Sequence, residues 1–158
     1  MTEWTQRAHV LADHAVSGVL GHVSSLHFDT MSELLWVGSA SGQLTSHTGA
    51  LPTLPRYTSL AAHGAPKQPR HVRGILSDDK FIISLSEGRV CASQRQGLGR
   101  WSMQIEDHAP GVALAGLCAS PQSASSDIIV GGAAPNSHDA LFALHSISGR
   151  VVRSACLL

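Results

Sequence analysis

Residues 36–47 read WVGSASGQLTSH, and this stretch decides how the rest of the chain is interpreted. A hydrolase nucleophile elbow has the form Gly-x-Ser-x-Gly, on a strained turn between a strand and a helix. Here the framing glycines, Gly38 and Gly42, enclose Ala40, which has no nucleophilic atom. The residues after Gly42 alternate polar and apolar side chains, as a strand does, and show no helical stripe. The stretch therefore predicts a β-hairpin that turns at the Ser41-Gly42 dipeptide.

The hairpin recurs along the chain. Three related segments begin at Val23, Val72 and Leu114, and each reads as a short strand, a polar turn, an apolar strand, a second turn and a third strand. A histidine precedes each segment, at spacings of 41 and 45 residues: His22, His63 and His108. A period of about 40 to 45 residues with a Gly-His mark is typical of the blades of WD-repeat β-propellers.

The predicted fold is all-β, a WD-repeat β-propeller of which about three blades are present. The Trp-Asp dipeptide that ends a typical third strand is missing from all three segments, so we expect degenerate blades. Closed propellers have four to eight blades, so three blades indicate a partial propeller. We expect its parent to have seven blades. The expected organisation is an N-terminal extension followed by the partial propeller over 21–158: 1–20 for the extension, then blades at about 21–62, 63–107 and 108–158.

The composition favours a soluble intracellular protein. Among the 158 residues, acidic and basic side chains balance to a formal net charge of zero, so no long-range field attracts nucleic acid or an acidic membrane. The three cysteines are widely spaced and odd in number, which fits neither a disulfide framework nor a zinc site. No apolar run approaches the roughly 20 residues that a membrane-spanning helix needs, and no signal peptide is recognised at the N-terminus.

The sequence resembles the N-terminal WD-repeat region of the catalytic subunit of the poly(A)-specific PAN deadenylation complex, over roughly residues 20–152. The Arg-Tyr-Thr-Ser stretch is far more specific than a general WD pattern, whereas the third segment matches more loosely. Four segments carry the resemblance: LLWVGSASGQLTSHTG at 34–49, RYTSLAAH at 56–63, HVRGILSDDKFIISLSEGRV at 71–90 and SQRQGLGRW at 93–101.

The resemblance implies a role in shortening mRNA poly(A) tails. In that family a propeller precedes a linker that embraces a pseudokinase adaptor subunit, an inactive ubiquitin-hydrolase-like domain and a poly(A)-specific exonuclease. The nuclease uses magnesium held by motifs that begin with Asp-x-Glu, and this chain has no such motif. The chain is thus expected to be a non-catalytic, cofactor-free scaffold in the cytoplasm and its P-bodies. Its expected partners are the adaptor and, indirectly, poly(A)-binding protein and poly(A) RNA, with no membrane.

Six residues are candidates for contact with a partner or with RNA: Lys67, Arg70, Arg73, Arg95, Arg100 and Trp101. The first three belong to a Pro-rich basic loop between the first two blades, which can reach phosphates or an acidic patch. That loop has no aromatic residue to stack on adenines, so solvated loop charge is the competing interpretation. Trp101 begins a predicted outer strand, where a half-exposed aromatic side chain is expected.

Two other functions remain open. A WD-repeat interaction scaffold from another pathway would share the period, although not the ordered family segments. A small β-rich hydrolase would need a histidine and a carboxylate to converge on a serine such as Ser39 or Ser86. A metal site is not predicted, because His22 and His27, which are five residues apart, lie on opposite faces of a strand.

Overall fold

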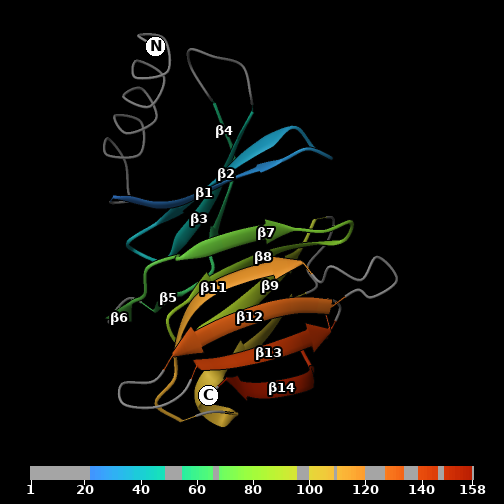
Figure 1. The fold of residues 1–158 in the computed structure, drawn as a ribbon. Helices are drawn as coiled ribbons and strands as arrows, with labels where there is room; N and C mark the ends of the chain where they lie inside the picture. Colours follow the sequence, from blue (N-terminus) through green and yellow to red (C-terminus); the bar gives the residue numbers. More distant parts are fainter. Residues whose placement is uncertain are drawn as a thin grey trace, which may run out of the picture. The chain divides into compact units, whose positions relative to one another are not determined.

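The structure, a computed structural model, describes residues 22–48, 55–65, 68–95, 100–108, 110–119, 127–133, 139–145 and 148–157 (Figure 1). The predicted N-terminal extension, 1–20, lies outside the described residues. The chain folds as two compact units, Met1–Val72 and Arg73–Leu158. The described part is almost entirely β-structure arranged in three four-stranded antiparallel sheets, which confirms the predicted fold class.

The first unit contains the first of these sheets and confirms the predicted hairpin. The sheet has the strand order of the chain: β1 (Val23–Asp29), β2 (Leu34–Ser39), β3 (Gln43–Thr48) and β4 (Arg56–Ala61). Strands β2 and β3 pair across the predicted turn, with Val37 opposite Thr45. Gly42 closes the turn with a φ of 82°, a left-handed conformation that glycine adopts without steric cost. Residues 56–61, whose side chains alternate in exposure, form the fourth strand of this sheet.

A short hairpin in the Pro-rich loop was not expected. Strands β5 (Gly64–Ala65) and β6 (Gln68–Pro69) form a two-residue antiparallel pair, where the sequence predicts an irregular loop. Proline cannot donate a backbone hydrogen bond, which makes it a poor residue for the interior of a sheet. A pair of strands this short has no interior, so the proline is tolerated.

The second unit contains the other two sheets, drawn from green to yellow and from orange to red in Figure 1. The second sheet consists of β7 (Gly74–Ser77), β8 (Phe81–Ser86), β9 (Arg89–Gln94) and β10 (Arg100–Gln104). A 3-10 turn, η1 (Ile105–Asp107), follows β10. The third sheet consists of β11 (Ala113–Ala119), β12 (Asp127–Ala133), β13 (Asp139–His145) and β14 (Val151–Leu157). Each predicted blade range encloses one four-stranded sheet, while the boundaries themselves stay predictions.

The second and third sheets stack face to face in the second unit. Alternate side chains from both sheets form one buried apolar cluster, which includes Leu85 and Val90 from the second sheet and Val130 and Phe142 from the third. The first strand of the third sheet, β11, lies against β7 and β8 of the second. Because successive residues of a strand point to opposite faces, the sequence alternation in β8, β9, β12 and β13 supplies this cluster directly.

Candidate interaction surface around the β8–β9 turn

The turn between β8 and β9, residues 86–89, ties together three segments of the second unit. Its sequence, SEGR, offers a serine and a glycine, which favour tight turns. The Ser86 hydroxyl donates a hydrogen bond to the Arg89 carbonyl at 3.2 Å and closes the turn. The Gly88 carbonyl accepts the Ile105 amide at 3.0 Å, and the Glu87 carbonyl accepts the Leu114 amide at 2.6 Å. The turn is therefore hydrogen-bonded both to the segment that follows β10 in its own sheet and to β11, the first strand of the third sheet.

The first unit contains the same arrangement around the β2–β3 turn. The Gly42 carbonyl accepts the His63 amide at 3.0 Å, just after the fourth strand, and the Ser39 carbonyl accepts the Val72 amide at 3.1 Å. His63 and Ile105 thus occupy corresponding places, as do Val72 and Leu114. The segments that repeat in the sequence therefore also repeat a pair of backbone hydrogen bonds, and these bonds fix the position of each turn.

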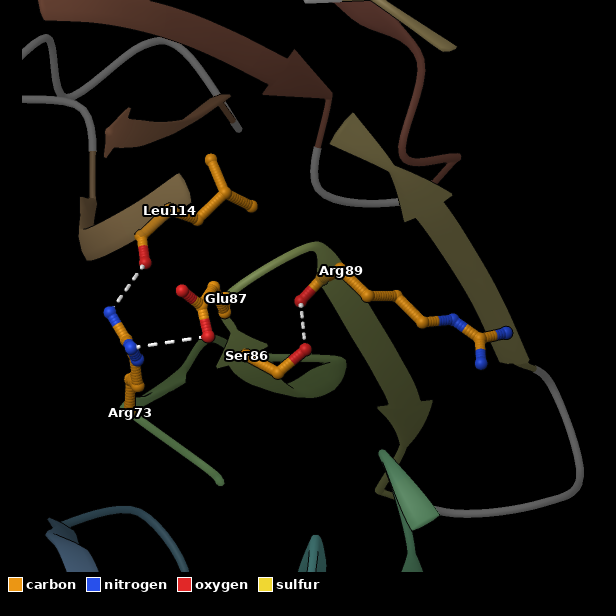
Figure 2. Close-up of polar contacts among 5 residues, drawn as sticks. All are labelled: Arg73, Ser86, Glu87, Arg89 and Leu114. Carbon is orange, nitrogen blue, oxygen red and sulfur yellow. Dashed lines mark hydrogen bonds and ion pairs between the residues drawn. The ribbon is translucent and has the colours of Figure 1, made fainter. Parts of the chain in front are cut away.

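An ion pair adds a side-chain contact to the 86–89 turn (Figure 2). One guanidinium nitrogen of Arg73, Nη2, lies 3.3 Å from Glu87 Oε2, and the other, Nη1, donates to the Leu114 carbonyl at 3.5 Å. The exposed fractions of the Arg73 and Glu87 side chains are 42% and 62%, so solvent screens the pair. Arg73, a predicted contact residue, is therefore already engaged within its own unit.

We expect the Arg73–Glu87 pair to contribute little to folding. A double-mutant cycle of Arg73→Ala and Glu87→Ala should give a coupling free energy of about 0.2–1 kcal/mol, the range for exposed ion pairs. Chemical denaturation of the four proteins measures this coupling, and added salt should reduce it. A coupling above about 2 kcal/mol that resists salt would show that the pair is far less screened than its exposure indicates.

The other predicted basic contacts divide between the two units. Lys67 lies outside the described residues, and Arg70 is exposed after β6 in the first unit. Arg95 follows β9, at the end of the second sheet away from the 86–89 turn. Its Nε donates to the Asp78 carbonyl at 2.6 Å, and its backbone amide donates to the Lys80 carbonyl at 2.9 Å. Arg95 thus fastens the β7–β8 turn.

Arg100 and Trp101 begin β10 and point to opposite faces of the second sheet. Arg100 is exposed, whereas Trp101 is half-buried and packs against the apolar cluster. The indole ring lies so close to Gly149 that a Cβ at that position would be 2.3 Å from Trp101 Cε3. Trp101 therefore contributes to packing within the second unit. Sequence reasoning did not single out Glu87 or Arg89, although the Gly88 turn at the end of an apolar strand marks their position.

Neither serine of the hydrolase alternative has catalytic surroundings. Ser39 and Ser86 each end the second strand of a sheet, and both are buried. The Ser39 hydroxyl lies 2.8 Å from the Ser41 hydroxyl and accepts the Gln43 amide at 3.1 Å. Ser86 bonds to the Arg89 carbonyl, as described above. Within the described part of the chain, these contacts close turns and bring no imidazole or carboxylate to either hydroxyl.

We expect Ser39→Ala to affect stability and not chemistry. The change leaves the partly buried Gln43 amide without its Ser39 acceptor, which should lower the free energy of unfolding by about 0.5–1.5 kcal/mol. Urea denaturation measures this loss, and hydrolysis of p-nitrophenyl acetate by both proteins supplies the second readout. The exposed Ser32→Ala variant is the control for background hydrolysis. Ester turnover that disappears only in Ser39→Ala would contradict the turn-closing role.

The described residues do not fit a metal centre. Across residues 22–157, apart from the undescribed gaps, no three histidine, cysteine or acidic side chains gather to hold an ion. The magnesium of the nuclease implied by the resemblance therefore has no ligand set in this part of the chain. The described residues also include no helix long and apolar enough to cross a membrane.

Comparison with known proteins agrees with this architecture. Residues 8–134 match the family described as PAN2 N-terminal. The PAN2-PAN3 deadenylation complex catalytic subunit pan2 of Aspergillus oryzae is 44% identical over 84 residues, and that of Schizosaccharomyces pombe is 36% identical over 85 residues. These matches cover 53% and 54% of this chain but only 7% of either relative.

Solved structures show the same fold. The Neurospora crassa Pan2 WD40 domain superposes with a TM-score of 0.69 at 26% sequence identity, over 86% of this chain and 38% of that domain. BamB from Moraxella catarrhalis superposes with a TM-score of 0.60 at 13% identity, over 87% of this chain and 38% of that protein. The second likeness concerns the fold alone.

Proposed function

The chain belongs to the PAN2 N-terminal family, and from this premise we propose that it is a non-catalytic propeller scaffold of a poly(A)-specific deadenylase. The match over residues 8–134, together with the blade-like sheets, is the observation that carries the proposal. The names of the relatives pair PAN2 with PAN3, so the direct partner is a PAN3-type adaptor subunit. Poly(A)-binding protein and poly(A) RNA are reached indirectly, in the cytoplasm.

The geometry of the turns supports a role in presenting surface loops. Binding residues often lie on loops that a rigid scaffold holds in place. Here the β2–β3 turn and the β8–β9 turn are each fixed at two carbonyls by amides from later segments. Such a scaffold raises the local concentration of an attached nuclease at its substrate, which can strengthen apparent binding by orders of magnitude without new chemistry.

Two measurements on the purified chain test this proposal. The chain should co-elute with a purified PAN3-type adaptor in size-exclusion chromatography, and Phe142→Ala, which weakens the packing of the second unit, should reduce the complex. Incubated alone with oligo(A) and magnesium, the chain should leave the oligonucleotide intact. Absence of a complex with the adaptor would contradict the scaffold role, and tail shortening by the chain alone would contradict the non-catalytic role.

A further inference from the structure

One face of the second sheet belongs to the apolar cluster, and on its other face the β8 residues Ile82, Ser84 and Ser86 are buried as well. In β8 and β9 the cross-strand pairs Ile83–Ala92 and Leu85–Val90 belong to the apolar cluster. The intervening residues point to the other face, because side chains alternate along a strand. On that face Cys91 lies opposite Ser102, Arg89 opposite Gln104 and Ser93 opposite Arg100. We call the outer part of this face, made of these six residues on β9 and β10, the β9–β10 face.

Two guanidinium groups share this face, and no ion pair joins either of them to an acidic side chain within the described strands β8 to β10. Arg89 Nη2 donates to the Ser102 hydroxyl at 2.9 Å, and Figure 2 shows its side chain extending away from Arg73 and Glu87. Arg89 Nε is buried and has no hydrogen-bond partner among the described residues. Arg100 is exposed, and strands β8, β9 and β10 contain no acidic residue. The three described strands themselves thus supply two positive charges and no negative one to this face, and the nearest acidic residues after β10 are Glu106 and Asp107 in η1.

The charges of Arg89 and Arg100 both influence the thiol of Cys91, which lies on the same face. Burial raises the pKa of the Cys91 thiol, and the positive charges of Arg89 and Arg100 oppose that rise. The register agrees, because the Cys91–Ser102 pair stands between the Arg89–Gln104 pair and the Ser93–Arg100 pair. Because Arg89 and Ser93 are four residues apart on β9, the register places the two arginine backbones about 13 Å apart along the strands.

This spacing fits an extended peptide better than a nucleic acid. In an extended chain, residues four apart lie on one face at about 13 Å, so two acidic side chains at that spacing would each meet one arginine. Guanidinium groups form strong charge-assisted hydrogen bonds with carboxylates. Nucleotide binding normally adds aromatic side chains for base stacking, but Trp101, on the same strand as Arg100, packs into the opposite face.

We propose that the β9–β10 face binds an extended acidic segment of a partner protein, with Arg89 and Arg100 donating to carboxylates four residues apart. The exposed Ser102 hydroxyl, which already orients Arg89, supplies a further polar group beside them. The proposal rests on the scaffold role in one respect, because it takes the ligand to be part of a bound protein. It assigns to that scaffold a surface and the charge of the segment that the surface recognises.

Fluorescence polarisation with a labelled peptide of alternating Glu and Thr tests the proposal on the purified 158-residue chain. The peptide should bind, its Gln counterpart should not, and added salt should weaken the complex. Arg100→Glu should weaken binding by about tenfold or more, because it replaces an attraction with a repulsion at an exposed position. Arg89→Gln, which keeps the size and polarity of this half-buried side chain, should weaken it by about fivefold.

Arg150→Glu is the matched control, because Arg150 is an exposed arginine just before β14 and undergoes the same charge change. It should leave peptide affinity within about twofold, since it lies outside the β9–β10 face. Equal losses in Arg150→Glu and Arg100→Glu, or no binding by the wild-type chain, would overturn the proposal. The proposal would also be overturned, in favour of a nucleic-acid ligand, if a labelled oligo(A) of the same charge bound more tightly than the peptide and Arg100→Glu abolished that binding. Adaptor binding without peptide binding would remove this inference alone and leave the scaffold role standing.

Discussion

Replacing Phe142 with alanine is expected to lower the free energy of unfolding by about 3–5 kcal/mol, the range for removing a buried aromatic side chain. Phe142 is 3% exposed on β13 and belongs to the cluster that joins the second and third sheets. The loss combines apolar surface returned to water on unfolding with the cavity that truncation leaves between two sheets. Urea denaturation followed by far-ultraviolet circular dichroism measures the change.

Leu141→Ala is the matched control for this prediction. Leu141 is the preceding residue of the same strand, but it points to the opposite face and is 36% exposed. Its truncation should cost about 1 kcal/mol or less, because less apolar surface is lost and no closed cavity forms. Similar losses in the two variants would mean that the third sheet does not bury one face against its neighbour.

Gly132→Ala is expected to lower the free energy of unfolding by about 3 kcal/mol, at the upper end for an overpacked site. Gly132 lies on β12 beside the start of β11. A Cβ on this residue would lie 2.5 Å from the Ala113 carbonyl oxygen and 2.9 Å from Val112 Cγ1. The first contact is with backbone, so relief requires a shift of the strand and not just a change of rotamer. Thermal and urea denaturation both measure the effect.

Gly116→Ala tests the same chemical change where there is space. Gly116 lies on the neighbouring strand, β11, and a Cβ there would meet no atom within 4 Å. We expect no loss of stability, and a gain of up to about 1 kcal/mol, because alanine restricts the unfolded chain more than glycine does. Destabilisation of Gly116→Ala to the level of Gly132→Ala would contradict the register between these two strands.

The sequence predicts the strands well because their signal is local. Alternation of side chains marks the hairpin around Gly42, and the structure confirms it. The β5–β6 pair and the 3-10 turn at Ile105–Asp107 were not predicted, since each has too few residues for a periodic pattern. The backbone contacts of the turns, such as that of Glu87 with Leu114, join residues distant in sequence and leave no pattern in it.

The candidate site was less predictable, because the sequence shows which side chains are charged but does not show which group each of them contacts in the fold. Arg73 pairs with Glu87. Arg95 donates to the backbone carbonyl of Asp78, and strands β8 and β9 separate these two residues in the sequence. Arg89 stands outside any basic run, and only the strand register places it on the same face as Arg100. Local charge clusters therefore identified arginines that hold turns together, whereas the β9–β10 face emerged from strand pairing.

The central claim is that the second and third sheets stack as adjacent blades within the second unit. Nuclear Overhauser spectroscopy on methyl-labelled protein tests it at Gly74 of β7 and Leu117 of β11, where a Cβ on Gly74 would lie 2.6 Å from Leu117 Cδ2. The account predicts a strong cross-peak between the Gly74 α-protons and a Leu117 methyl group. Absence of that cross-peak, in spectra that show the expected cross-strand contacts within both sheets, would contradict the stacking.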